Sequence, residues 1–315
     1  MTEHRIDAGP ETVHWGYFDA GLPPVLTVSS GDAVVLSTHS GPRETLPPDG
    51  FATVAPAHRA ILAAHQPRFP GHICTGPVAV RGARPGQVLE VRIRAIALND
   101  DWGFTFSAPL KGALPDDFPQ SHLMHERLDA ARMVGTLPWG LELPLKPFFG
   151  VMAVAPPAAW GPVNTLPPRR NGGNLDNKEL VAGTTLYLPI HVDGALFSVG
   201  DGHGVQGDGE VCVTAIETGL VGTFELHLRE DFALDWPMAE TPTHVITMAF
   251  DPDLDQASVI ALRLMLDLVA ARTGLTRQEA YALCSLAADL RITQVVNGAK
   301  GVHVMLEKRY LVGRP

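Results

Sequence analysis

The sequence has no long hydrophobic run, no excess of basic charge and few cysteines. No segment of its 315 residues approaches the ~20 consecutive apolar residues of a membrane-spanning helix, so we expect no membrane partner. Its 24 Lys and Arg against 34 Asp and Glu give a net charge of −10, which argues against nucleic acid as a partner because phosphate binding needs a basic face. Cys74, Cys212 and Cys284 form no CxxC pair and no charged-then-apolar leader begins the chain, so we expect a cytoplasmic protein.

Glycine and proline are abundant instead, with 31 Gly and 27 Pro residues, and both residue types mark turns. Short β-branched runs lie between these turns as far as about residue 250, which is typical of a mainly β protein. We expect a sandwich-like β fold with long loops at 104–118 and 138–168. The predicted strands include residues 25–29, 33–38, 88–98, 186–192, 211–217 and 223–228.

A helical pattern occurs only near the C-terminus. Apolar residues at helical spacing, then a capping box of Thr276 and Glu279, predict a helical pair at about 256–290. No segment resembles a flexible linker, so residues 1–315 should form a single unit. Its expected parts are a β-rich region at 1–250, the helical pair and a closing β-hairpin at 291–312.

The densest polar cluster lies at residues 200–210, GDGHGVQGDGE. If the middle of this segment forms a hairpin loop, His203 pairs with Asp208 and Asp201 with Glu210, and all four side chains share one face. Carboxylates that face each other repel, so a bound cation, a shared proton or a nearby basic residue must offset their charge. His and carboxylate side chains are ligands of divalent metals. The alternative is a solvated glycine-rich turn whose acidic side chains face water.

Three further polar residues, Asp176, His39 and Glu217, are candidates for the same site. Asp176 is either a ligand or an Asx-turn residue. His39 and His72 lie near strand ends, where a lone histidine is usually structural, and Glu217 ends a predicted strand where it could pair with a surface cation. The sequence has no G-x-S-x-G motif and no cysteine in a catalytic context, which favours attack by an activated water if the protein is a hydrolase.

Several motifs, in order along the chain, are similar to those of one known family. They are THSGP at 38–42, TGPV at 75–78, GGNLD at 172–176, GTTLYLP at 183–189, GALFSV at 194–199 with the cluster after it, Glu217, RITQVVNG at 291–298 and GVHVM at 301–305. The chain resembles the acetamidase/formamidase family over nearly its whole length. The segment from Gly172 to Glu217 is long and specific.

The resemblance implies a mainly β, sandwich-like enzyme that hydrolyses small aliphatic amides to a carboxylic acid and ammonia. It also implies a homo-oligomer, dimer or higher, and a divalent metal, expected to be zinc, at the polar cluster. Other amides or lactams are alternative substrates. A protein that binds a small amide without cleaving it is the alternative function.

Amide hydrolysis needs an activated water, stabilisation of the oxyanion and a proton for the leaving amine. The residues expected to hold the metal or its water are His39, Asp176, Asp201 and His203. The residues expected to transfer the proton are Asp208, Glu210 or Glu217. The sequence does not separate ligand from base among these acidic residues.

Overall fold

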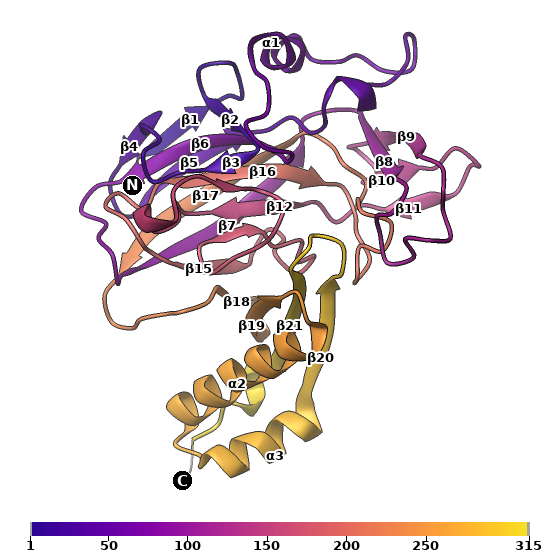
Figure 1. Ribbon diagram of the computed structural model, residues 1–315. Helices are drawn as coiled ribbons and strands as arrows, with labels where there is room; N and C mark the ends of the chain where they lie inside the picture. The colour runs from indigo at the N-terminus through magenta and orange to yellow at the C-terminus, as the bar shows by residue number, and fades with distance from the viewer. Residues whose placement is uncertain (1, 314–315) are drawn as a thin grey trace.

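The computed structural model describes residues 2–313. Within these residues, sheets of nine, six and four strands, a two-stranded pair and three α-helices make up the molecule (Figure 1). The two-stranded pair is β3 (Tyr17–Phe18) with β13 (Val163–Asn164), and α1 (Pro56–Ala64) is the first helix along the chain.

The largest sheet runs through the whole molecule. Its strands, in spatial order, are β1 (Glu3–Ile6), β5 (Asp32–Ser37), β17 (Leu220–Arg229), β7 (Val88–Leu98), β15 (Thr185–Pro189), β18 (Met238–Glu240), β19 (His244–Asp251), β21 (Lys300–Glu307) and β20 (Ala288–Gln294). β1 pairs with β5 in parallel, and the other pairs are antiparallel. β7 has the bounds predicted from its alternating pattern.

The second sheet packs against the first half of the large sheet. Its strands are β14 (Gly172–Asn174), β12 (Phe148–Ala153), β16 (Phe197–His203), β6 (Ile73–Val80) and β2 (Val13–Trp15), with β4 (Leu26–Val28) also paired to β6. Leu89 and Phe224 of the large sheet and Phe149 and Phe197 of the second sheet belong to one buried hydrophobic core. The sandwich-like β fold predicted from the sequence is therefore confirmed.

The third sheet lies beside this sandwich (Figure 1). Its strands are β11 (Glu142–Pro144), β10 (Val134–Thr136), β9 (His122–Asp129) and β8 (Trp102–Ser107). The expectation of loops at 104–118 and 138–168 is wrong where β8, β11, β12 and β13 occupy these segments. β12 was missed because every residue in it is buried, and such a strand is a continuous apolar run without alternation. Residues 108–121 do form a loop.

The C-terminal helices cover the other half of the large sheet. α2 (Leu254–Thr273) and α3 (Arg277–Ala287) pack on β19 and β21 and project from the body of the molecule (Figure 1). The predicted capping box of Thr276 and Glu279 is present. α3 ends earlier than predicted because residue Ala288 adopts an extended conformation and begins β20. The loop at 295–299 between β20 and β21 points back toward the sandwich (Figure 1).

Candidate active site

Two strands of the second sheet bring the site together. β16 carries Asp201 and His203 at its end, and Phe148 of β12 lies opposite His203. Asp176 follows β14, which pairs with the other edge of β12. All three polar side chains are buried, so the second sheet holds an imidazole and two carboxylates in its interior.

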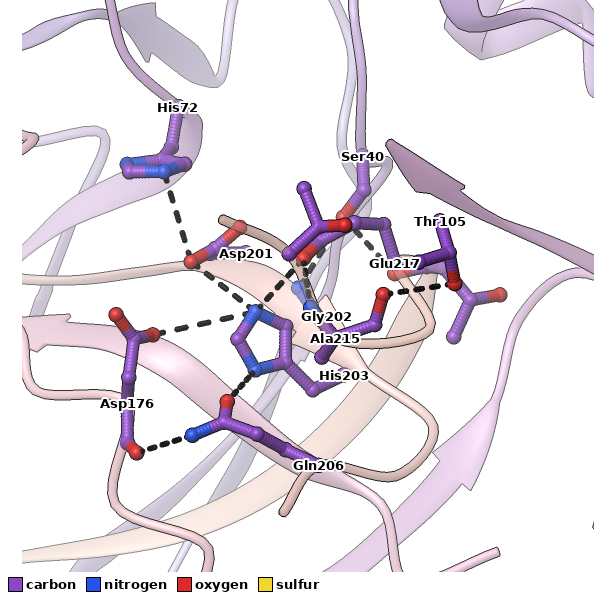
Figure 2. A network of polar contacts seen from close by, with 12 residues as sticks. Ser40, His72, Thr105, Asp176, Asp201, Gly202, His203, Gln206, Ala215 and Glu217 are labelled. Carbon is purple, nitrogen blue, oxygen red and sulfur yellow. Dashed lines mark hydrogen bonds and ion pairs between the residues drawn. The ribbon is translucent and has the colours of Figure 1, made fainter. Parts of the chain in front are cut away.

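His203 lies at the centre of this cluster (Figure 2). Its Nε2 atom lies 3.2 Å from Glu217 Oε1, 3.3 Å from Asp201 Oδ2 and 3.9 Å from Asp176 Oδ1. The Nε2 atom of His72 lies 3.6 Å from the same oxygen of Asp201. The structure therefore gathers carboxylates from three separate segments around one imidazole nitrogen.

The hairpin expected at 200–210 does not form, and that prediction is wrong. β16 ends at His203, which makes an isolated bridge with Glu217 instead of pairing with Asp208. Positive φ angles at Glu210 (45°) and Val213 (99°) turn the backbone, so the strand expected at 211–217 is absent from the described residues.

The acidic residues of this segment therefore separate. Glu210 and Glu217 return to the cluster and are buried. Asp208 does not join them, because it lies at the surface and pairs with Lys178 at 2.9 Å.

Hydrogen bonds define the orientation of the His203 ring. Nδ1 lies 2.9 Å from Gln206 Oε1, and the nitrogen must donate because an amide oxygen only accepts. Gln206 in turn donates from Nε2 to the backbone oxygen of Asp176. In the neutral ring Nε2 is then an acceptor that faces carboxylate oxygens, which are also acceptors. A proton or a cation must lie between them.

Buried polar atoms without a hydrogen-bond partner indicate whether these residues fit a cation. The Nε2 atom of His203, Oδ1 of Asp176 and Oε2 of Glu210 are buried and make no hydrogen bond. A buried polar atom without a partner costs about 1–3 kcal/mol, so three at one point indicate a missing common partner. The residues fit a divalent cation, because an imidazole nitrogen and carboxylate oxygens are its usual ligands.

Across residues 2–313, two groups of residues have ligand atoms within 4.8 Å of one another. The first is Asp176, His203 and Glu210, whose unpartnered atoms are described above. The second is Asp201, His203 and Glu217, which shares the imidazole.

The shifted pKa values show the electrostatic cost of burying these ionisable groups side by side. Burial raises the pKa of Glu217 to about 8, although the nearby His203 opposes the shift. Burial, together with the nearby charge of Asp176, raises the pKa of Glu210 well above its ordinary value. Burial also raises the pKa of Asp176. Burial alone would lower the pKa of His203, but Glu217 and Asp201 raise it well above its ordinary value. A divalent cation would favour the ionised carboxylates because its charge offsets their repulsion.

His39 belongs to neither group, although it was expected to be a ligand. Its Nδ1 atom lies 3.4 Å from Asp100 Oδ2, and its ring stacks on that of His58 with the centroids 5.1 Å apart. It still lines the cavity above the cluster. The structure therefore places His39 beside the site rather than among the clustered ligand atoms.

Four residues that contact the cluster were not predicted from the sequence. His72 contacts Asp201, Gln206 orients His203, and Asn297 donates to Asp176 Oδ2 from the β20–β21 loop. A Cβ atom on Gly150 of β12 would lie 2.5 Å from Asp176 Oδ1 and 2.6 Å from Asp201 Oδ2. A single glycine inside a buried strand is the available sequence signal for such a close approach.

A cavity of about 730 Å³ opens onto the cluster. Asp201, Glu210 and Glu217 line it, together with His39 and His72. A substrate can therefore reach the carboxylates, whereas His203 and Asp176 do not line the cavity.

The fold and the site define a class: a β-sandwich protein with a histidine–carboxylate centre suited to a divalent cation at the floor of a cavity. The sequence profile of the Acetamidase/Formamidase family matches residues 18–162 and 157–306. The chain belongs to this family, and the resemblance seen in its motifs is confirmed.

Individual relatives agree with this assignment. A formamidase from Methylophilus methylotrophus is 29% identical, and the match covers 44% of this chain and 47% of that protein. The aligned part thus spans about half the length of this curated relative. The crystal structure of an acetamidase from Bacillus halodurans is 32% identical, has a TM-score of 0.84 and covers 97% of this chain and 98% of its own.

A γ-lactamase from Delftia acidovorans has the same fold. Its TM-score is 0.65 at 21% identity, and the match covers 98% of this chain and 93% of the lactamase. At this identity the likeness shows the fold alone.

Proposed function

We propose that this protein is an amidase that hydrolyses small amides to a carboxylic acid and ammonia. The observation that supports the proposal most is the convergence of the unpartnered atoms of Asp176, His203 and Glu210 below the cavity, in a chain of this family. A protein that only binds amides needs no such concentration of buried charge, because burying unpaired charge is costly.

We propose ligands for the cation from the two groups of clustered residues. Asp176, His203 and Glu210 would hold the cation, which we propose to be zinc, and Asp201 is a candidate fourth ligand beside the same nitrogen. When bound, the cation would supply Lewis-acid polarisation of the amide carbonyl and a lowered pKa for water. In this assignment Glu210 is a ligand instead of the expected base, and His39 is not a ligand.

Glu217 is our proposed proton carrier. It lines the cavity, and its Oε1 atom accepts a hydrogen bond from the backbone N–H of Ala215 at 3.1 Å, which holds the carboxylate in place. A carboxylate placed there can take a proton from the attacking water and deliver it to the leaving nitrogen. Asp208, which is exposed and paired with Lys178, has no part in this scheme.

Ammonia release from formamide and acetamide, measured with metal analysis of the purified protein, tests the function. We expect a divalent cation in near-stoichiometric amount and at least ~100-fold loss of turnover after chelation, because the carboxylates lose the charge that holds them together. Adding zinc back should restore turnover.

The assay temperature separates a catalytic cation from a structural one. Chelation should also lower the melting temperature, since a ligand of the native state stabilises it. Turnover must therefore be measured well below the melting temperature of the metal-free protein. Full turnover of folded, metal-free protein would contradict the proposal.

The chain within residues 2–313 has no helix that is long and apolar enough to cross a membrane. Cys74, Cys212 and Cys284 are free thiols. Free thiols agree with a reducing compartment, so we retain the cytoplasm as the proposed location.

We also propose a homo-oligomer built through β20 and α3. β20 is an edge strand of the large sheet, and such edges readily pair with another chain. Apolar side chains are exposed beside it, with Leu286 at 86% and Leu290 at 48% exposure. Light scattering should give at least twice the mass of one chain, and the double variant Leu286→Glu, Leu290→Glu should shift the protein to a single chain. A wild-type monomer at assay concentration would reject this proposal.

A further inference from the structure

The cavity is much larger than formamide or acetamide needs. Its volume is about 730 Å³. Each water in the liquid takes up about 30 Å³, so acetamide with about four non-hydrogen atoms fills on the order of 100 Å³. Cavities of several hundred Å³ are the size that encloses a larger organic ligand. Most of this volume therefore lies beyond the amide group.

One wall of the remaining volume is apolar. Phe106 of β8 and Leu123 of β9 are cross-strand partners, and both line the cavity. They pack against the buried cluster of Val54, Trp102 and Phe104, but each stays half-buried. These side chains therefore keep apolar surface free toward the cavity, on a rigid pair of strands.

A second apolar wall comes from a distant part of the chain. Val295 and Val296 belong to the β20–β21 loop, which points toward the sandwich (Figure 1), and both are half-buried and line the cavity. The adjacent Asn297 donates to Asp176, which ties this loop to the cluster. The loop thus places apolar side chains at a defined distance from the carboxylates.

Away from the cluster, the charged residues that line the cavity favour neither a positive nor a negative group on the substrate. Lys111 and Glu44 both line it, and both are exposed. A charged end on the substrate would meet one attractive and one repulsive partner. The apolar walls are the stronger recognition element.

We propose that the preferred substrates are primary amides with a bulky apolar acyl group, such as an arylacetamide or a medium-chain alkyl amide. The acyl group lies against Phe106, Leu123 and Val296, while the carboxamide reaches Glu217. This inference rests on the proposed amidase function. We place the bulky group on the acyl side of the amide, because formamide and acetamide, after which the formamidase and acetamidase relatives are named, differ only in their acyl group.

Ammonia release from formamide, acetamide, butyramide, hexanamide and phenylacetamide tests this proposal. Each buried methylene contributes about fourfold in kcat/KM, so the ratio of phenylacetamide to acetamide should be at least ~10. Phe106→Ala and Leu123→Ala should each lower that ratio about 10-fold or more. Phe118→Ala, which changes an exposed phenylalanine outside the cavity lining, should leave the ratio and both rates unchanged.

The outcomes separate the two proposals. A rate that stays flat or falls with acyl size, a preference for a cyclic amide, or an unchanged ratio in both cavity variants would overturn the substrate class while acetamide is still cleaved. No ammonia from any amide would overturn the amidase function as well.

Discussion

Glu210→Gln should lower the kcat for acetamide at least ~100-fold and should also empty the metal site. Glu210 Oε2 is buried without a hydrogen bond, and it lies within 4.8 Å of the ligand atoms of Asp176 and His203. A neutral amide is a poor ligand and removes one negative charge, so the site loses affinity for a divalent cation. Steady-state ammonia release and metal analysis of the same preparation measure both effects.

Two matched variants distinguish a ligand from a proton carrier. Glu217→Gln should lower kcat by a similar factor while the metal stays bound, because Glu217 belongs to the other group around His203. Asp208→Asn removes an exposed carboxylate and should leave both quantities within about twofold of wild type. If Glu210→Gln keeps its metal and loses only turnover, Glu210 is the base and our assignment is reversed.

Local patterns predicted the elements whose signal lies within a few neighbouring residues. The alternation of residues 88–98 gave the bounds of β7, and the Thr276–Glu279 capping box placed the start of α3. Both signals depend on neighbours within a few residues, where side-chain periodicity and capping act directly. The strand β12 was missed for the opposite reason, since its apolar character reflects burial on both faces by distant segments.

The site was predicted in its residue types and not in its geometry. Asp201 and Glu210 each lie near His203, in two different groups, but the hairpin expected to join them is absent. Asp176 and Asp201 have φ angles of 46° and 56°, and Glu210 has 45°. Residues other than glycine adopt this conformation at a cost, and alternation along a strand does not encode it. The surrounding fold must impose it.

Backbone strain is concentrated at the acidic residues of the cluster. Three of the clustered acidic residues have positive φ angles, and each such residue costs on the order of 1–3 kcal/mol, somewhat less for Asp. The same three carboxylates are buried beside one another. A sequence selected only for stability would keep neither feature. A bound cation would offset the repulsion, and its binding free energy would compensate the backbone cost, because binding to the native state adds stability.

Gly150→Ala should abolish most activity without unfolding the protein. Gly150 lies in β12 beneath the cluster, and a Cβ atom there would lie 2.5 Å from Asp176 Oδ1, 2.6 Å from Asp201 Oδ2 and 2.9 Å from His203 Cε1. These contacts are closer than van der Waals distance, so the side chains must move. A displacement of about 1 Å at a catalytic centre costs roughly 100-fold in rate, and we expect at least that loss in kcat and a weaker affinity for the cation.

Gly207→Ala is the matched control for this substitution. Gly207 lies in the same polar segment as the cluster, its φ angle is not positive, and no atom lies within 4 Å of an added Cβ. It should keep wild-type kcat, metal content and melting temperature. At Gly150 the nearest atoms belong to side chains that can rotate, so Gly150→Ala should keep its circular dichroism spectrum. Wild-type turnover in Gly150→Ala would show that the close approach of these carboxylates has no part in the reaction.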